Sequence, residues 1–252
     1  MTSEKREVAF DHHAADFVHS NYERYRRLRE ECPVAHTASH GGFWVVTGYD
    51  EVFQVARDDH TFSSRNGGVI PPTNVGRLLP IQADPPELER YRHLLNPYVT
   101  QNAVKLLEPF IEQTTDAAID RFVEAGRADL VLDLANPVPA MTTMSLLGLD
   151  PDDWRFFAEP LHQVMYTRPG SPENEEGQQK VLGFSGRIAT EVEARRRRPR
   201  GDMISRLLAS EFGSVKTSFE EVCDLVRMVI FGGMYLARPA RSCGSIALQI
   251  AI

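Results

Sequence analysis

The chain has few cysteines, no long apolar run and no excess of positive charge. Its three cysteines, Cys32, Cys223 and Cys243, lie far apart, and neither a C-x-x-C motif nor a cysteine/histidine metal-ligand spacing occurs. This sparse usage argues against a disulfide framework and suits a reducing compartment. The apolar runs fall short of the ~20 residues that a membrane span needs, and residues 1–10 are too polar for a signal peptide. We therefore expect a cytoplasmic protein that does not associate with membranes.

Charge and composition further restrict the class of protein to which the chain can belong. The net charge of −7 disfavours nucleic acid as a partner, and the basic run 195–198 lies where a helix is predicted to end, a position that favours positive charge. With 252 residues and 42% hydrophobic content, the chain can bury a sizeable core without disulfides or metals. Because nothing repeats and no linker is obvious, a single domain over 1–252 is expected.

The stretch from Ser218 to Met234 predicts a buried helix at the centre of the fold. Ser218 and Glu221 form a capping box at its start. Apolar residues then occupy nearly every side of the helix up to Phe231, the pattern of a helix enclosed by others. Gly232 and Gly233 follow, although each glycine costs about 1 kcal/mol against alanine inside a helix. They indicate either a kink or C-cap, or the close approach of a flat ligand.

A second helix signal is D-P-P-E at residues 84–87. Asp84 suits an N-cap, Pro85 the first helical position and Glu87 the capping box, so a helix is predicted to begin at Pro85 and to end before Pro97. Arg92 shares a partly apolar face with Leu88. Such an arginine either binds a carboxylate or extends its charged end to solvent.

The rest of the chain predicts further helices and little sheet. A strand is expected within 42–49, an ordered loop over 61–84 and a second short strand over 127–133. A polar hinge is expected over 167–176. Helices are expected over 21–31, 51–57, 107–122, 134–147 with Gly148 as C-cap, 178–196 and 202–211.

Four segments, in this order, resemble bacterial cytochromes P-450, the haem-thiolate monooxygenases. They are Y-E-R-Y-R-R-L-R-E-E-C-P-V with G-F-W-V-V-T-G-Y-D-E-V, then T-F-S-S, then A-D-P-P-E-L-E-R-Y-R-H-L-L-N-P, and the long helix with F-G-G-M. The similarity covers almost the whole chain but only the N-terminal portion of a family member. It implies a mainly α fold with a small N-terminal β-sheet, truncated after the central long helix.

The resemblance also implies cofactor, substrate and partners. Arg92 falls on the arginine that binds a haem propionate, and Gly232 and Gly233 on the residues that approach the distal face of the haem. The loop 67–81 and the segment 154–168 correspond to the substrate lid. An apolar small-molecule substrate, a ferredoxin or flavoprotein redox partner and a missing C-terminal half are implied. The candidate substrate-wall residues are Val69, Ile70, Leu79, Leu161 and Met165.

The chain departs from the family in two places. After Gly233 it lacks the acidic residue and threonine that deliver protons to bound oxygen, and Tyr235–Cys243 is open to interpretation as a frame-shifted stretch. The cysteine loop that ligates iron does not occur either, and the context of Cys243 does not match it. We therefore expect this chain alone to be catalytically silent. The alternatives are a non-catalytic helical binding protein and a gene fragment.

Histidines near the start of the chain raise one more possibility. His12, His13 and His19 contain the ligand type of a metal cluster but have no fixed spacing. Solvated side chains are the expectation for all three.

Overall fold

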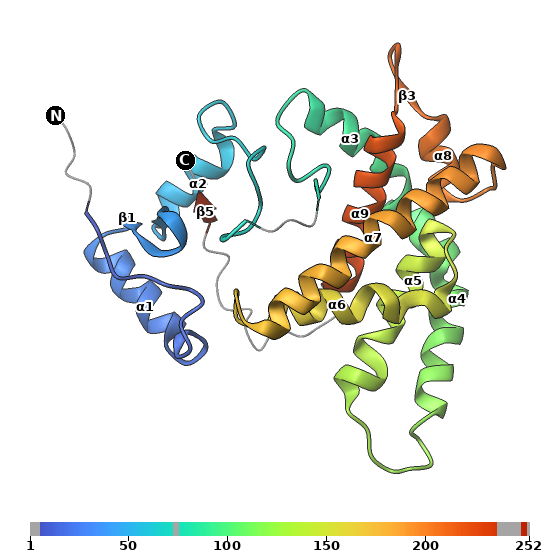
Figure 1. The fold of residues 1–252 in the computed structure, drawn as a ribbon, viewed down its shortest axis with the longest axis horizontal. Helices are drawn as coiled ribbons and strands as arrows, with labels where there is room; N and C mark the ends of the chain where they lie inside the picture. Colours follow the sequence, from blue (N-terminus) through green and yellow to red (C-terminus); the bar gives the residue numbers. More distant parts are fainter. Residues whose placement is uncertain (1–5, 73–75, 236–247, 251–252) are drawn as a thin grey trace. The chain divides into compact units, whose positions relative to one another are not determined.

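The computed structural model describes residues 6–72, 76–235 and 248–250. In this part the chain is mainly helical and forms two compact units (Figure 1). Unit 1 comprises Met1–Thr73, Ile81–Pro85 and Ala240–Ile252, and unit 2 comprises Asn74–Pro80 and Pro86–Pro239. The single domain expected over 1–252 stays a prediction.

Unit 1 contains the small sheet. Strands β1 (Val34–Thr37), β2 (Phe43–Val46) and β5 (Leu248–Ile250) pair antiparallel in the order β1-β2-β5, with Ala35 opposite Val45 and Val45 opposite Gln249. The 3-10 turn η1 (Ser39–Gly41) joins β1 to β2. Helices α1 (Phe17–Glu31) and α2 (Tyr49–Arg57) flank β1 and β2 in the sequence. The sheet confirms the small N-terminal sheet expected from the aromatic and β-branched run.

An aromatic core holds unit 1 together. Phe10, Tyr25, Phe43, Val45 and Ile70 are buried against one another. The Phe10 ring lies 5.7 Å from that of Tyr25 and 6.3 Å from that of Phe43, typical distances for favourable aromatic pairs. Ile70 brings part of the long loop into this core, so the loop is ordered at this point, as predicted.

Unit 2 is a helical assembly around its last helix. Helix α9 (Phe219–Tyr235) contacts α5, α6, α7 and α8, and α6 and α7 pack along each other (Figure 1). The remaining elements are α3 (Glu87–Leu95), η2 (Asn96–Tyr98), α4 (Gln101–Asp120), η3 (Val131–Ala135), α5 (Pro137–Leu147), η4 (Pro151–Asp153), α6 (Trp154–Tyr166), α7 (Pro172–Arg197) and α8 (Met203–Ala209). A hairpin of β3 (Glu211–Phe212) and β4 (Val215–Lys216) precedes α9. Within unit 2, the buried helix predicted for 218–234 is confirmed.

Three local predictions were wrong. Residues 127–133 do not form a strand, because the Asp129 carboxylate accepts the N–H groups of Val131 and Leu132 at 3.0 and 3.1 Å and turns the chain into η3. Helix α3 begins at Glu87 and not at Pro85, and Asp84 instead accepts hydrogen bonds from Ser63 and Ser64. Helix α7 begins inside the expected hinge.

The start of α7 has a capping signal that the hinge interpretation missed. The Ser171 hydroxyl accepts the N–H of Asn174 at 3.2 Å, and Pro172 occupies the first helical position. The expected C-cap at Gly148 is confirmed, because that residue is left-handed with φ of 80° at the end of α5.

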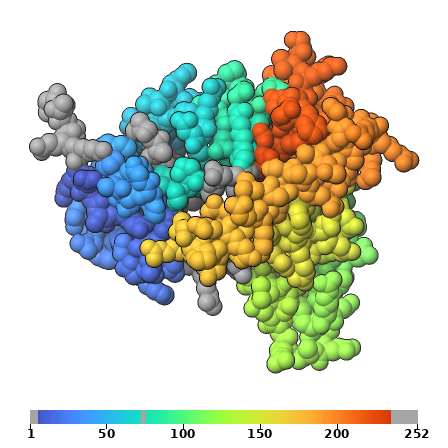
Figure 2. All heavy atoms as spheres, in the orientation of Figure 1, coloured from blue at the N-terminus to red at the C-terminus, as the bar shows by residue number. Residues whose placement is uncertain are grey.

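One part of unit 2 projects from the rest. The lower end of α4 and the residues up to α5 extend away from the other helices of this unit (Figures 1 and 2). Val123, Leu130 and Leu132 are exposed there.

In the described ranges, no helix combines the length and apolar character needed to cross a bilayer.

Candidate functional site

The candidate site is built on α9, whose first turn is fixed by its own sequence. The Ser218 N–H donates to the Glu221 carboxylate at 2.7 Å, and the Glu221 N–H donates to the Ser218 hydroxyl at 3.1 Å. These reciprocal bonds satisfy backbone donors that a helix start leaves free. The predicted capping box is therefore present.

The same carboxylate connects α9 to α3. Arg90 donates to both Glu221 oxygens at 2.7 and 3.0 Å, and the Tyr91 hydroxyl donates at 2.7 Å. Burial by itself raises the pKa of Glu221, but these hydrogen bonds and that from Ser218 outweigh it and lower the pKa to about 2. Burial, followed by the bond to Glu221, raises the pKa of Tyr91. Glu221 is thus ionised and held by both helices.

Arg92 does not take part in this connection. Two positions after Arg90, it lies about 200° further round the helix. Its side chain is exposed and has no hydrogen-bond or ion-pair partner in the parts of the chain that the structure describes. The carboxylate partner considered for Arg92 therefore belongs to Arg90, and the Arg92 guanidinium is left available to a ligand.

The two glycines of α9 have different surroundings. A Cβ added to Gly233 would lie 1.9 Å from Oγ1 of Thr143, so this glycine allows α9 to pack closely on α5. A Cβ added to Gly232 would approach only Met228 Cε, at 3.7 Å, among the described residues. Gly232 is therefore the position at which a planar ligand has more room. Pro239, which costs about 3 kcal/mol inside a helix, predicts a break or kink near Ala237, and this position lies outside the described residues.

The expected wall residues divide between the two units. Val69 and Ile70 belong to unit 1, whereas Leu79, Leu161 and Met165 belong to unit 2. Ile70, Leu79 and Leu161 are buried; Val69 and Met165 are 46% and 43% exposed. Within each unit, only the exposed members present apolar side chains that are not already used in packing.

The two polar residues in the middle of α9 hold part of the long loop. Arg227 pairs with Asp224 and donates to the backbone oxygen of Arg77 at 2.9 Å. Its guanidinium also fills the space beside Gly76, which is left-handed with φ of 87°. In the sequence, Asp224 and Arg227 interrupt the apolar pattern of this helix, but no residue near them indicates this long-range contact.

An open depression lies along α7 and the start of α9. Its volume is about 500 Å³. Ala189, Thr190, Glu193, Ala194, Arg197 and Phe219 line it. None of the expected substrate-wall residues is among them.

The described cysteines do not fit the thiolate ligand of a haem iron. Cys223 is buried in α9, and burial raises the pKa of its thiol to about 11, which favours the protonated form. Cys32, in unit 1, donates its S–H to the Val34 oxygen at 3.1 Å. Cys243 lies outside the described residues. The described part of the chain therefore contains no cysteine suited to ligate a haem iron.

Histidines come together in unit 1, but not in the combination considered from the sequence. His12 and His13 lie next to His40, whereas His19 lies on α1 and is exposed. His40 was missed because it follows His13 by 27 residues, and only the turn between β1 and β2 brings it back.

Relatives of this chain are known from sequence and from structure. It is 29% identical to the cytochrome P-450 monooxygenase PikC of Streptomyces venezuelae over 86% of its length and 53% of that protein. It is 30% identical to linalool 8-monooxygenase of Pseudomonas putida over 86% of its length and 58% of that protein. No protein-family profile matches.

The solved structures that are similar to this chain are likewise cytochromes P-450. A testosterone complex of CYP109E1 from Bacillus megaterium superposes with a TM-score of 0.71 at 26% identity, over 87% of this chain and 58% of that one. The polyketide synthase cytochrome P-450 PksS of Bacillus subtilis gives 0.74 at 23% identity and supports the fold alone. The chain spans between half and two thirds of the length of these relatives. The resemblance to the N-terminal portion of a bacterial cytochrome P-450, and the mainly α fold that it implies, are confirmed.

Proposed function

We propose that this chain, which resembles the N-terminal portion of bacterial cytochromes P-450, is part of a haem-dependent monooxygenase. The reaction is the insertion of one oxygen atom of O2 into an apolar small molecule, with electrons from a ferredoxin or flavoprotein partner. Two relatives, PikC and linalool 8-monooxygenase, are named as monooxygenases and support this class of reaction. When bound, the haem iron supplies the oxygen chemistry, and the protein positions cofactor and substrate.

The observation that carries this proposal is that two arginines of α3, Arg90 and Arg92, have different surroundings. Arg90 is occupied by Glu221, whereas Arg92 on another face of the same helix is exposed and has no partner in the described chain. A planar guanidinium binds a carboxylate through two parallel hydrogen bonds. Arg92 is therefore the proposed ligand of a haem propionate.

The remaining proposed contacts with haem and substrate follow from how much space surrounds each candidate residue. Gly232 is the proposed point of closest approach to the haem, and Gly233 supports it by letting α9 lie against Thr143 of α5. Val69 and Met165 are the stronger substrate-wall candidates because they are exposed, while Ile70, Leu79 and Leu161 are proposed to support the wall from within each unit.

We propose that the chain by itself is catalytically silent. Neither described cysteine suits a thiolate ligand, and the chain matches little more than half of its relatives. A segment that corresponds to the C-terminal half of the family, in the same or another polypeptide, would have to supply the iron ligand.

Reconstitution with haem tests both parts of the proposal. We expect the purified chain to bind haem, and we expect the reduced carbon monoxide complex to lack the Soret band diagnostic of thiolate ligation. Arg92→Ala should weaken haem binding about 10- to 100-fold, because a hydrogen bond to a charged group contributes about 1.5–3 kcal/mol. Arg121→Ala, which removes another exposed arginine, is the matched control and should bind as the wild type does.

The two parts fail in different ways. A thiolate-type Soret band would show that a cysteine of this chain reaches the iron and would contradict catalytic silence. Equal haem affinity in the Arg92→Ala and Arg121→Ala variants would contradict the propionate assignment.

The second candidate is a non-catalytic helical binding protein. The exposed apolar residues Val123, Leu130 and Leu132 on the projecting part of unit 2 favour it. It predicts a chain that is monodisperse and melts cooperatively without haem. Haem uptake with a dependence on Arg92 would favour the monooxygenase proposal instead.

A further inference from the structure

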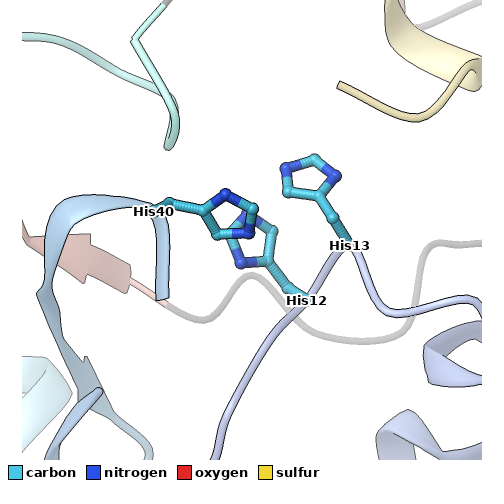
Figure 3. Close-up of side chains that lie close together, drawn as sticks. All are labelled: His12, His13 and His40. Carbon is cyan, nitrogen blue, oxygen red and sulfur yellow. The ribbon is translucent and has the colours of Figure 1, made fainter. Parts of the chain in front are cut away.

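Three imidazole rings from two separate segments of unit 1 converge (Figure 3). His12 and His13 precede α1, and His40 lies in η1 between β1 and β2. One ring nitrogen of each lies within 4.8 Å of one from each of the other two. The ring centroids are 4.1 Å apart for His12 and His13, 5.4 Å for His12 and His40, and 5.1 Å for His13 and His40.

Two of these rings lie within hydrogen-bonding distance of the same oxygen atom. Nε2 of His12 lies 2.7 Å from the Ile70 carbonyl oxygen, and Nε2 of His13 lies 3.0 Å from it. Because a carbonyl oxygen can only accept hydrogen bonds, each of the two rings donates its Nε2–H to it and keeps its lone pair on Nδ1.

The third ring is oriented by a carboxylate. Nε2 of His40 lies 2.8 Å from Oδ1 of Asp11, and the same oxygen accepts the His13 N–H at 2.8 Å. With Nε2–H donated to Asp11, the lone pair of His40 is on Nδ1. A histidine that ligates a metal commonly donates its other ring N–H to a carboxylate in this way.

Hydrogen bonding within the cluster leaves two features unexplained. Nδ1 of His12 is buried and has no hydrogen-bond partner in the described chain. His40 has φ of 52° and ψ of 34°, and it is the one non-glycine residue with positive φ in the described ranges. A sparsely populated conformation of this kind persists only where the surroundings hold it, and such positions gather at functional sites.

We propose that His12, His13 and His40 bind a divalent transition-metal ion through the ring nitrogens opposite those that donate to the Ile70 carbonyl and to Asp11. Imidazole nitrogen suits zinc, copper and nickel, so the ion belongs to this group. The bound ion connects the segment before α1 with the β1–β2 turn. This site is independent of the haem proposal, since it uses other residues and needs no haem.

Calorimetric titration of the metal-free full chain with Ni²⁺ tests the proposal. We expect one ion per chain. His13→Gln and His40→Asn should each weaken binding at least ~10-fold, because loss of even a supporting group around a metal ligand costs about 10- to 100-fold. Glutamine can still donate to the Ile70 oxygen, and asparagine tolerates the left-handed backbone of position 40.

His19→Gln is the matched control, because His19 is exposed on α1 outside the cluster. It should bind Ni²⁺ as the wild type does. Circular dichroism establishes that each variant is folded. If a histidine variant is unfolded, Asp11→Asn replaces it and is expected to weaken binding about 10- to 100-fold.

Several results would overturn the proposal. One is the absence of Ni²⁺ binding by the wild type. Another is an affinity that the cluster variants leave unchanged, or that His19→Gln lowers as much as they do.

Discussion

Arg90 of α3 and Glu221 of α9 form an ion pair with two parallel hydrogen bonds, although the two residues are 131 positions apart in the sequence. The guanidinium donates at 2.7 and 3.0 Å to a carboxylate that also caps the first turn of α9. Their side chains are only 12% and 19% exposed, so water screens the pair poorly. One carboxylate thus fixes both where α9 begins and how α3 docks on it.

Removal of this carboxylate should destabilise unit 2. Glu221→Gln leaves Arg90 without an ionic partner in a mostly buried position, and we expect a loss of roughly 2–4 kcal/mol in the free energy of unfolding. Urea denaturation followed by circular dichroism measures it. Glu220→Gln, an exposed neighbour in the same turn, should change stability by less than about 0.5 kcal/mol. Equal effects of the two changes would contradict the role of Glu221.

The contribution of Glu221 should depend on pH in a defined direction. Its pKa falls from 4.5 to about 2 on folding. The ionised form therefore stabilises the fold above pH 4.5, and this stabilisation is lost as the pH falls towards 2. The difference in unfolding free energy between wild type and Glu221→Gln should be constant from pH 7 to 5 and shrink below about 4.5. Other carboxyl groups titrate in both proteins and cancel; a difference that grows on acidification would refute the assignment.

The two glycines of α9 should respond to alanine with opposite signs. Gly233→Ala places a methyl group against Thr143 and should cost about 1–3 kcal/mol by overpacking. Gly232→Ala meets no close atom in the described chain and should stabilise the helix by up to about 1 kcal/mol. Thermal denaturation of both variants without haem is the measurement. Destabilisation by Gly232→Ala to the same extent would mean that both glycines serve packing.

Arg195 should be far more important for stability than its basic neighbours. It is buried, pairs with Glu191 and Asp202, and donates to the Gly148 carbonyl at the end of α5. Arg195→Ala would leave these groups without their partner, and a loss of roughly 3–5 kcal/mol is expected. Arg196→Ala, where the side chain is 61% exposed, is the control and should cost less than about 1 kcal/mol. Chemical denaturation of both variants is the measurement. Similar losses of unfolding free energy in the two variants would contradict the prediction.

Local chemistry made several elements predictable. The capping box of Ser218 and Glu221, the left-handed Gly148 and the continuous apolar surface of α9 depend on residues within a few positions of one another. The strand expected at 127–133 failed for an equally local reason, since the Asp129 side chain competes for backbone N–H groups. Asp84 had the signature of an N-cap, but Ser63 and Ser64 occupy its oxygens.

Periodicity, caps and the order of motifs along the chain are enough to predict the resemblance to cytochromes P-450, the mainly helical fold and the buried position of α9. The packing of distant elements, in contrast, determines that Arg90, and not Arg92, binds the carboxylate, that Gly233 faces Thr143, and that His40 joins His12 and His13. Each of these contacts joins residues that are remote in sequence. No local pattern specifies which of several arginines, glycines or histidines a distant partner will meet, because that depends on how whole elements pack.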